Sequence, residues 1–274
     1  MSNILEIPAS RVLRHVLRPR QTLEQPMRVQ VIPAGDEPPL FTSPFYLANI
    51  GPADNPLLLD LRFAQTDHGF SIALLMTNER YPYDLTTIAG EILRRMDMQG
   101  IAFDGVVAPE SLGSKLSQEI ARLRGDYTHH TTLQKGKPRA DEAGNVSVAA
   151  PKAWIGEDCG IAVSSGTSHP AAQQKLYLDP QIAERLMALP NGVLIVDDAR
   201  LSSGTVTSSI NLLRQMNVPI AAVATVLNEH DPVDEIDGIP YIWLTKLPIF
   251  DRGADGWTPR AGSYKGLPAF FVEV

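Results

Sequence analysis

The sequence predicts an α/β fold in which a parallel sheet has helices on both faces and a β-rich extension precedes it. Three observations support this prediction. Residues 192–213 have the pattern of a buried strand, a short polar loop and a helix. Residues 103–123 repeat that order, as the successive βαβ units of a parallel sheet do. Residues 1–50 instead carry many prolines and little periodicity, and the apolar runs that follow up to residue 80 favour strands.

The N-terminal segment is predicted to be a β-rich subdomain or hood over residues 1–80, followed by an α/β domain over residues 81–274. Residues 27–32 have the alternation of a strand. Residues 57–63 and 70–76 are two further apolar runs, and the turn-prone sequence Thr-Asp-His-Gly joins them. This arrangement predicts a hairpin.

The α/β domain is predicted to begin with a helix, because apolar residues recur at helical spacing after Tyr81 and Gly100 is placed to end the run. These residues are Leu85, Ile88, Ile92, Leu93 and Met96. A strand over residues 103–108 and a polar loop over 109–113 follow. The next helix is indicated by Leu116, Ile120 and Leu123.

Residues 132–175 form a long polar connection whose length favours a lid or binding loop. Short strands are expected within it at residues 154–155 and 160–163. After it, Asp179 and Pro180 have the pattern of a helix start. Residues 220–227 and 241–245 are predicted to add strands to the sheet.

Residues 192–213 contain groups that could bind a phosphorylated sugar. The apolar strand Val193 to Val196 leads into the acidic pair Asp197 and Asp198, which can hold a diol or a hydrated Mg²⁺. The loop Ser202, Ser203, Gly204 and Thr205 then opens a helix, where hydroxyls, backbone N–H groups and the helix dipole favour a phosphate. Gly204 allows the backbone to approach it closely.

Residues 193–205 resemble the phosphoribosyl-pyrophosphate (PRPP) motif of the type I phosphoribosyltransferases, which is four apolar residues, two acids and a Thr-Gly-x-Thr loop. The resemblance implies that Asp197 and Asp198 bind the ribose hydroxyls, and that Ser202, Ser203, Gly204 and Thr205 bind the 5′-phosphate. Ser202 stands where Thr is usual and Ser203 where Gly is usual. Receiver domains also carry an acidic pair after a strand, but they need a later strand that ends in an acid. Residues 241–246 have none.

The loop after residue 108 resembles the pyrophosphate loop of adenine and xanthine phosphoribosyltransferases, whose pattern is Gly-Pro-Glu-x-Arg-Gly. The resemblance assigns pyrophosphate binding to Glu110, Ser111, Leu112 and Gly113, with Leu112 in place of the usual Arg. Residues 132–138 resemble the start of the catalytic loop of the same enzymes. Lys135, a catalytic candidate, and Lys137 would then face the pyrophosphate; exposed lysines in a polar loop are the alternative.

The resemblance implies the fold of the type I phosphoribosyltransferases with a C-terminal hood over the base. It also implies transfer of a phosphoribosyl group from PRPP to a nitrogenous base, with a purine favoured, Mg²⁺ as cofactor and a homo-oligomeric assembly. Base-binding candidates are Leu201, Phe250 and Trp257, although aromatic residues of this kind are more often core. Leu201 occupies the position of an Asp in the hypoxanthine–guanine enzymes, so their proton-transfer route is absent here.

A non-catalytic sensor of PRPP or a nucleotide is the rival interpretation. Leu112 in the pyrophosphate loop favours it, whereas the acidic pair and the long connection favour an enzyme. A hydrolase acting on a ribosylated substrate has no nucleophile motif to support it.

The amino-acid composition limits the functional classes to which the protein could belong. The net charge of −7 argues against a general nucleic-acid surface. The single cysteine, Cys159, excludes an internal disulfide and suits a reducing cytoplasm. No apolar run reaches the length of a membrane span, so a soluble cytoplasmic protein is expected. His129 and His130 lack partners at ligand spacing, and no protein-bound metal cluster is expected.

Overall fold

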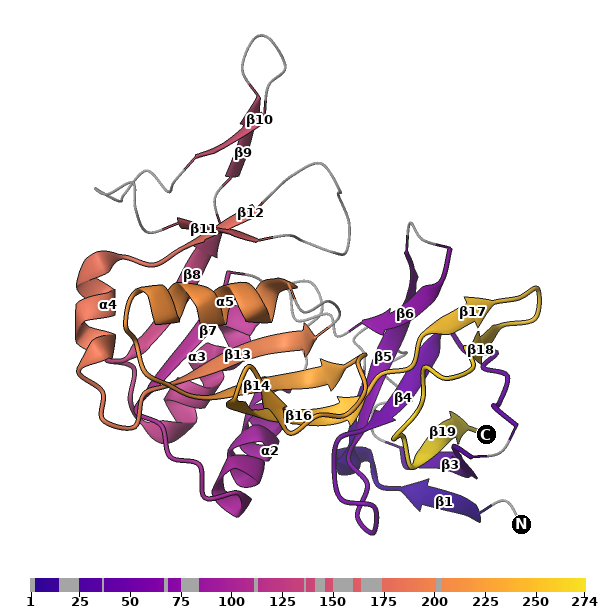
Figure 1. Cartoon of the computed structure of the whole chain (residues 1–274). Coiled ribbons are helices and arrows are strands. Elements are labelled where there is room, and N and C mark those ends of the chain that lie inside the picture. The colour runs from indigo at the N-terminus through magenta and orange to yellow at the C-terminus, as the bar shows by residue number, and fades with distance from the viewer. Residues whose placement is uncertain are drawn as a thin grey trace. The chain divides into compact units, whose positions relative to one another are not determined.

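A computed structural model describes most of the chain, which divides into two compact units. The described residues are 3–14, 25–35, 37–66, 69–74, 84–110, 113–135, 137–140, 146–149, 160–163, 174–200 and 204–274. Unit 1 comprises Met1–Leu85, Val226–Pro232 and Trp243–Val274, and unit 2 comprises Thr86–Thr225 and Val233–Ile242. Figure 1 follows the chain through both.

Unit 1 is built on a sheet that has nine strands among the described residues, in the order β1-β3-β19-β4-β5-β6-β17-β18, with β2 paired to β5. The strands are β1 (Asn3–Ile7), β2 (Val12–Leu13), β3 (Met27–Pro33), β4 (Phe45–Asn49), β5 (Leu58–Gln65), β6 (Ser71–Leu74), β17 (Phe250–Arg252), β18 (Trp257–Pro259) and β19 (Ala269–Glu273). The predicted strand over 27–32 and the predicted hairpin are confirmed as β3 and as the antiparallel pair β5–β6.

The C-terminal strand β19 lies between β3 and β4, antiparallel to both. Both ends of the sequence therefore contribute to one sheet. Its core contains a cluster of aromatic rings that meet edge to face, with Phe250 5.7 Å from Phe41 and 5.2 Å from Tyr46 between ring centroids. Such contacts add to the free energy gained from burial alone.

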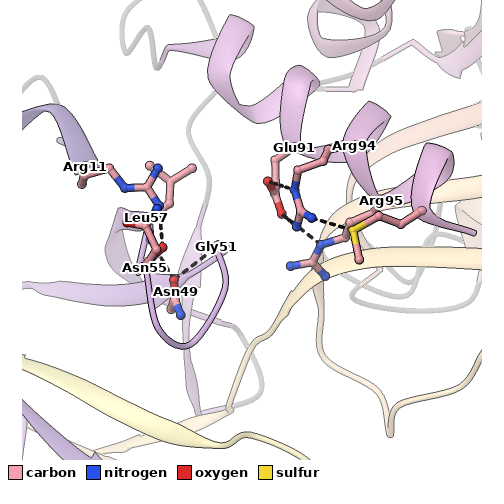
Figure 2. Close-up of polar contacts among 9 residues, drawn as sticks. Arg11, Asn49, Gly51, Asn55, Leu57, Glu91, Arg94 and Arg95 are labelled. Carbon is pink, nitrogen blue, oxygen red and sulfur yellow. Dashed lines mark hydrogen bonds and ion pairs between the residues drawn. The ribbon is translucent and has the colours of Figure 1, made fainter.

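The turn between β4 and β5 is held by a side chain that replaces missing backbone partners. Asn49 Oδ1 accepts hydrogen bonds from the backbone N–H groups of Gly51 and Leu57, each at 3.0 Å (Figure 2). The Arg11 guanidinium donates to the backbone oxygens of Asn55 and Pro56. An Asn that accepts from the backbone is a usual way of closing a turn.

A buried carboxyl group lies after β14 in unit 1. Burial raises the pKa of Glu229 to about 8, although the positive charge of Lys246 opposes the shift. Glu229 Oε1 is buried and has no hydrogen-bond partner among the described residues. The Lys246 ammonium donates instead to the backbone oxygens of Glu229, at 3.0 Å, and His230. Ionisation of Glu229 therefore opposes folding.

We expect Glu229→Gln to remove a pH dependence of stability. The folded-state pKa lies above the ordinary value of 4.5 for a glutamate, so the native state binds more protons than the unfolded state between these values. The free energy of unfolding then falls as pH rises from about 4.5 to 8. The variant should melt higher than the natural protein at pH 8 and no higher at pH 4.5, by about 2–4 °C for each kcal/mol. Equal melting curves at every pH would contradict the assignment.

Unit 2 contains most of a second sheet, which has eight strands among the described residues in the order β11-β12-β8-β7-β13-β14-β16-β15. The strands are β7 (Gly105–Pro109), β8 (His130–Lys135), β11 (Gly160–Val163), β12 (Gln174–Tyr177), β13 (Val193–Arg200), β14 (Ile220–Asn228), β15 (Glu235–Ile236) and β16 (Ile239–Lys246). The antiparallel pair β9 (Lys137–Ala140) and β10 (Val146–Ala149) forms a separate small sheet.

The helices follow the predicted apolar spacing. They are α2 (Leu85–Met98), α3 (Gly113–Arg124), α4 (Pro180–Met187) and α5 (Gly204–Gln215). In α2 the buried face includes Ile88, Ile92 and Met96, and Glu91 accepts hydrogen bonds from Arg94 and Arg95 one turn later (Figure 2). Gly100 follows the helix with φ 66°, a left-handed conformation that glycine adopts without strain.

The start of α4 is capped as predicted. The Asp179 side chain accepts a hydrogen bond from the Gln181 backbone N–H at 2.8 Å, and Pro180 occupies the first helical position. The capping carboxylate and the proline both favour a helix start at this point.

The predicted fold class, a parallel sheet with helices on both faces, is wrong. The sheet of unit 2 is mixed, because β12 runs antiparallel to β8 and to β11, and β15 runs antiparallel to β16. Unit 1 has a mainly antiparallel sheet of its own. Local patterns correctly indicate the strand–helix repeats at β7 and β13, but the antiparallel strands that extend the sheet carry no equivalent signal.

Candidate functional site

The acidic pair lies near the end of the buried strand β13. Its first four residues, Val193 to Val196, are fully buried, as expected for a central strand. Asp197 is 4% exposed and Asp198 is half-buried. The strand continues to Arg200, so the acids stand within its last residues rather than just beyond it.

The two acidic groups share an environment that disfavours negative charge. Burial raises the pKa of Asp197, and the charge of Asp198 raises it further; burial also raises the pKa of Asp198. Asp197 Oδ1 accepts the Asp198 backbone N–H at 2.9 Å. The positive charge of Lys135 lowers the pKa of both. A cation or a donating hydroxyl at this position would stabilise the ionised pair.

The first turn of α3 touches Asp197. A Cβ atom added to Gly113 would lie 2.9 Å from both the Cα and the Oδ1 of Asp197, and 2.9 Å from the Val196 carbonyl oxygen. Only a glycine leaves room for this approach. The loop after β7 and the acidic pair of β13 are therefore immediate neighbours, although 84 positions separate residues 113 and 197 in the sequence.

Three neighbouring parallel strands bring the other candidates to the same edge. β8 pairs with β7 and β7 with β13, all parallel, so their carboxyl ends coincide (Figure 1). Glu110, just after β7, accepts the Lys135 backbone N–H through Oε2 at 2.7 Å. Lys135 ends β8. Ligands of open α/β sheets bind at carboxyl strand ends, and this edge meets that condition.

The start of α5 supplies the remaining described candidates. Gly204 and Thr205 form its first turn, and the Thr205 backbone oxygen accepts the Ser209 hydroxyl at 2.9 Å. The helix runs for 12 residues from the end of the loop that follows β13. Its unpaired N-terminal N–H groups are donors for an anion.

Several predicted site residues have no described position. Ser111, Leu112, Leu201, Ser202 and Ser203 lie outside the described residues. Lys137 belongs to β9, and its side chain is not described.

Two base-binding candidates belong to unit 1. Phe250 is fully buried, and Trp257 stacks on Phe63 with ring centroids 4.6 Å apart. Both rings take part in the aromatic cluster of that unit. Their roles in base binding stay a prediction.

Arg200 and Tyr241 lie together in unit 2. The central carbon of the Arg200 guanidinium is 5.4 Å from the centroid of the Tyr241 ring. The sequence patterns gave neither residue a role. A signal for Arg200 is present in the sequence, since alternation in a strand places it on the same face as Asp198. Nothing local connects it to Tyr241.

Within the described ranges, no group of three or more His, Cys, Asp or Glu side chains could hold a metal ion. No helix that the structure describes is long and apolar enough to cross a membrane.

We expect Gly113→Ala to weaken ligand binding at this edge by at least about tenfold, because the added methyl group would displace the backbone of β13 at Asp197. Gly90→Ala is the matched control. A Cβ there meets nothing within 4 Å, and alanine is the better helix former by about 0.5–1 kcal/mol. Affinity for PRPP, the ligand that the sequence resemblance implies, is measured by calorimetry and should fall in the first variant only. Equal affinity in the two variants would show that the close contact between Gly113 and Asp197 is not needed for ligand binding.

Known proteins similar to this chain were sought by sequence and by structure. No family model matches the sequence, and no curated protein matches it. Similar solved structures include adenine phosphoribosyltransferase from Thermoanaerobacter pseudethanolicus, at 18% identity and a TM-score of 0.43, covering 59% of this chain and 80% of that chain.

Two further similar structures have comparable scores. Adenine phosphoribosyltransferase from Rhodothermus marinus is 16% identical with a TM-score of 0.42, covering 68% and 94%. A hypothetical protein from Neisseria gonorrhoeae with bound ppGpp is 14% identical with a TM-score of 0.39, covering 60% and 78%.

Proposed function

We propose that this chain binds PRPP with Mg²⁺ at the carboxyl ends of β7, β8 and β13 and transfers the phosphoribosyl group to a nitrogenous base. The contact between Gly113 and Asp197 carries the proposal. It places the loop that resembles a pyrophosphate site against the acidic pair that resembles a ribose site. One PRPP molecule needs both sites within its own length.

Each part of the edge has a chemical task in this proposal. The carboxylates of Asp197 and Asp198 accept hydrogen bonds from the two ribose hydroxyls. The first turn of α5 donates N–H groups to the 5′-phosphate, and the first turn of α3 donates to the pyrophosphate. Mg²⁺ is commonly held by one or two carboxylates together with substrate phosphates, and the acidic pair offers such ligands. When bound, the ion would neutralise charge on the pyrophosphate.

The proposed reaction breaks the bond between C1′ and the pyrophosphate oxygen and forms a bond between C1′ and a base nitrogen. Pyrophosphate leaves with the bonding electron pair, and the base nitrogen loses its proton to solvent or to the leaving group. Negative charge therefore grows on the pyrophosphate in the transition state. The Lys135 ammonium, close enough to lower the pKa of both acids, is placed to stabilise it.

The experiment that tests the proposal has two measurements. PRPP with Mg²⁺ should raise the melting temperature, since a ligand that binds only the native state stabilises it by mass action. A panel of purines, pyrimidines and their carboxylated relatives is then screened for pyrophosphate release. No thermal shift with PRPP at millimolar concentration would overturn the proposal.

A PRPP sensor without catalysis is the second candidate, and Leu112 favours it because the Arg usual at that position would contact pyrophosphate. Binding of PRPP without pyrophosphate release from any base would support the sensor. Turnover with one base would exclude it.

A further inference from the structure

Arg200 has donors that no described residue uses. Its Nε and Nη1 atoms are buried and lack a hydrogen-bond partner within the described part of the chain. An arginine stays charged at any physiological pH. Buried polar groups of folded proteins are nearly always paired, so an exception of this kind calls for an explanation such as a ligand.

The surroundings of Arg200 hold the guanidinium in place without neutralising it. Its central carbon lies 5.4 Å from the centroid of the Tyr241 ring. The Tyr241 hydroxyl is in turn fixed by Thr225 Oγ1 at 2.7 Å, and both of these side chains are buried. Burial raises the pKa of Tyr241 to about 12, so this ring carries no negative charge at neutral pH. The charge of Arg200 is left without a carboxylate partner among the ion pairs of the described residues.

The position of Arg200 relates it to the candidate site. It stands two residues after Asp198 on β13, and side chains two apart on a strand project from the same face. Asp197 is close enough to Tyr241 for its charge to affect the pKa of that hydroxyl. The guanidinium, the tyrosine and the acidic pair therefore belong to one region of unit 2.

We propose that Arg200 determines the acceptor substrate by binding a carboxylate group on it, so that the acceptor is a nitrogenous heterocycle bearing a carboxylate. This inference rests on the proposed function. A guanidinium has donors only and presents them in a planar fork that matches the two oxygens of a carboxylate. An amino-substituted ring would set donors against donors. A neutral ring without a carboxylate would leave the two buried N–H donors and the charge of this half-buried side chain without a partner, which is costly.

The test compares matched acceptor pairs in which one member carries the carboxylate and the other lacks it, namely orotate with uracil and nicotinate with nicotinamide. Pyrophosphate release with PRPP and Mg²⁺ gives kcat/KM, and calorimetry with Mg²⁺ and ribose 5-phosphate gives binding without turnover. We expect the natural protein to prefer the carboxylate member of at least one pair by about 100-fold or more, because a site built for an ionic partner rejects an analogue without it.

Arg200→Gln should remove this preference while the thermal shift produced by PRPP stays within about 2 °C of that of the natural protein. Arg200→Lys keeps the charge but loses the planar fork, so it should recover part of the preference. Arg214→Gln is the control, because its guanidinium already donates to the Asp237 backbone oxygen at 2.7 Å. It should leave both measurements unchanged.

The outcomes separate this inference from the proposed function. PRPP binding with equal use of both members of each pair, or with only uncarboxylated purines as acceptors, would overturn the role of Arg200 and leave the function standing. A lower melting temperature in Arg200→Gln and Arg200→Lys with the carboxylate preference intact would make Arg200 a structural residue. If the natural protein does not bind PRPP at all, the proposed function itself is wrong.

Discussion

Replacing the acidic pair of β13, Asp197→Asn with Asp198→Asn, is expected to abolish stabilisation by PRPP while raising the melting temperature of the ligand-free protein. Asparagine keeps the size of each side chain and the oxygen of Asp197 that accepts the Asp198 backbone N–H. It removes two carboxylates whose ionisation is opposed by burial and by each other. Differential scanning fluorimetry with and without PRPP and Mg²⁺ measures both effects.

The gain in stability should depend on pH with a defined sign. Both acids have folded-state pKa values above 3.8, the ordinary value for an aspartate. Their ionisation costs nothing below that pH and destabilises the native state increasingly as pH rises through the folded-state pKa. The melting temperature of the double variant should therefore exceed that of the natural protein at pH 7 and approach it near pH 4, by about 2–4 °C for each kcal/mol.

Asp104→Asn is the matched control in the same unit. Asp104 accepts hydrogen bonds from the Asn191 backbone N–H at 2.7 Å and side-chain amide at 3.0 Å, and these lower its pKa. Its removal should not raise the melting temperature, and the PRPP shift should persist. A double variant of Asp197 and Asp198 that still responds to PRPP as the natural protein does would disprove the assignment of the site.

The sequence allowed the local elements of unit 2 to be predicted well, because each has a signal within a few residues. The run Val193 to Val196 indicates a buried strand, and the spacing of Ile88, Ile92 and Met96 indicates a helix. Both are confirmed. The parallel pairing of β7 and β13 also fits the strand–helix repeat, because each of these strands is followed by a loop and a helix, as in the units of a parallel sheet.

The sheet as a whole could not be predicted in this way. β19 pairs with β3 although more than 200 residues separate them. No short-range pattern in the sequence specifies which two strands pair with each other. Residues 160–163 show the same limit. A strand was predicted there, but its antiparallel pairing with β12, which changes the class of the sheet, depends on partners outside the segment.

The residues of the candidate site differ in the same way: some have a local signal in the sequence, and others depend on distant partners. Asp197, Asp198 and Glu110 were found because each belongs to a strand–loop–helix pattern. The contact between Gly113 and Asp197 follows from two such patterns sharing one edge. Arg200 was not assigned, because its significance depends on Tyr241 from another strand and on nitrogen atoms that remain unpaired only in the folded chain.

Lys135→Ala is expected to reduce kcat by about 100-fold or more while changing the dissociation constant of PRPP by only a few-fold. Removing one donor from a site where charge develops commonly costs this much in the chemical step. The variant isolates the ammonium, because the bond to Glu110 is made by the Lys135 backbone N–H and survives the substitution. Single-turnover measurements with PRPP and the accepted base separate chemistry from binding.

Two control variants test whether the effect depends on the positive charge and on the position of the lysine. Lys135→Arg keeps a positive charge and should recover part of the rate, whereas Lys265→Ala removes a lysine that is 76% exposed in unit 1 and should leave the rate unchanged. Loss of the Lys135 charge also removes an influence that lowers the pKa of both acids. PRPP binding by Lys135→Ala should therefore begin to fail at a higher pH than in the natural protein as the solution is acidified. An unchanged rate and an unchanged pH dependence together would place the ammonium away from both the pyrophosphate and the acidic pair, and the chemistry at this edge would then proceed without Lys135.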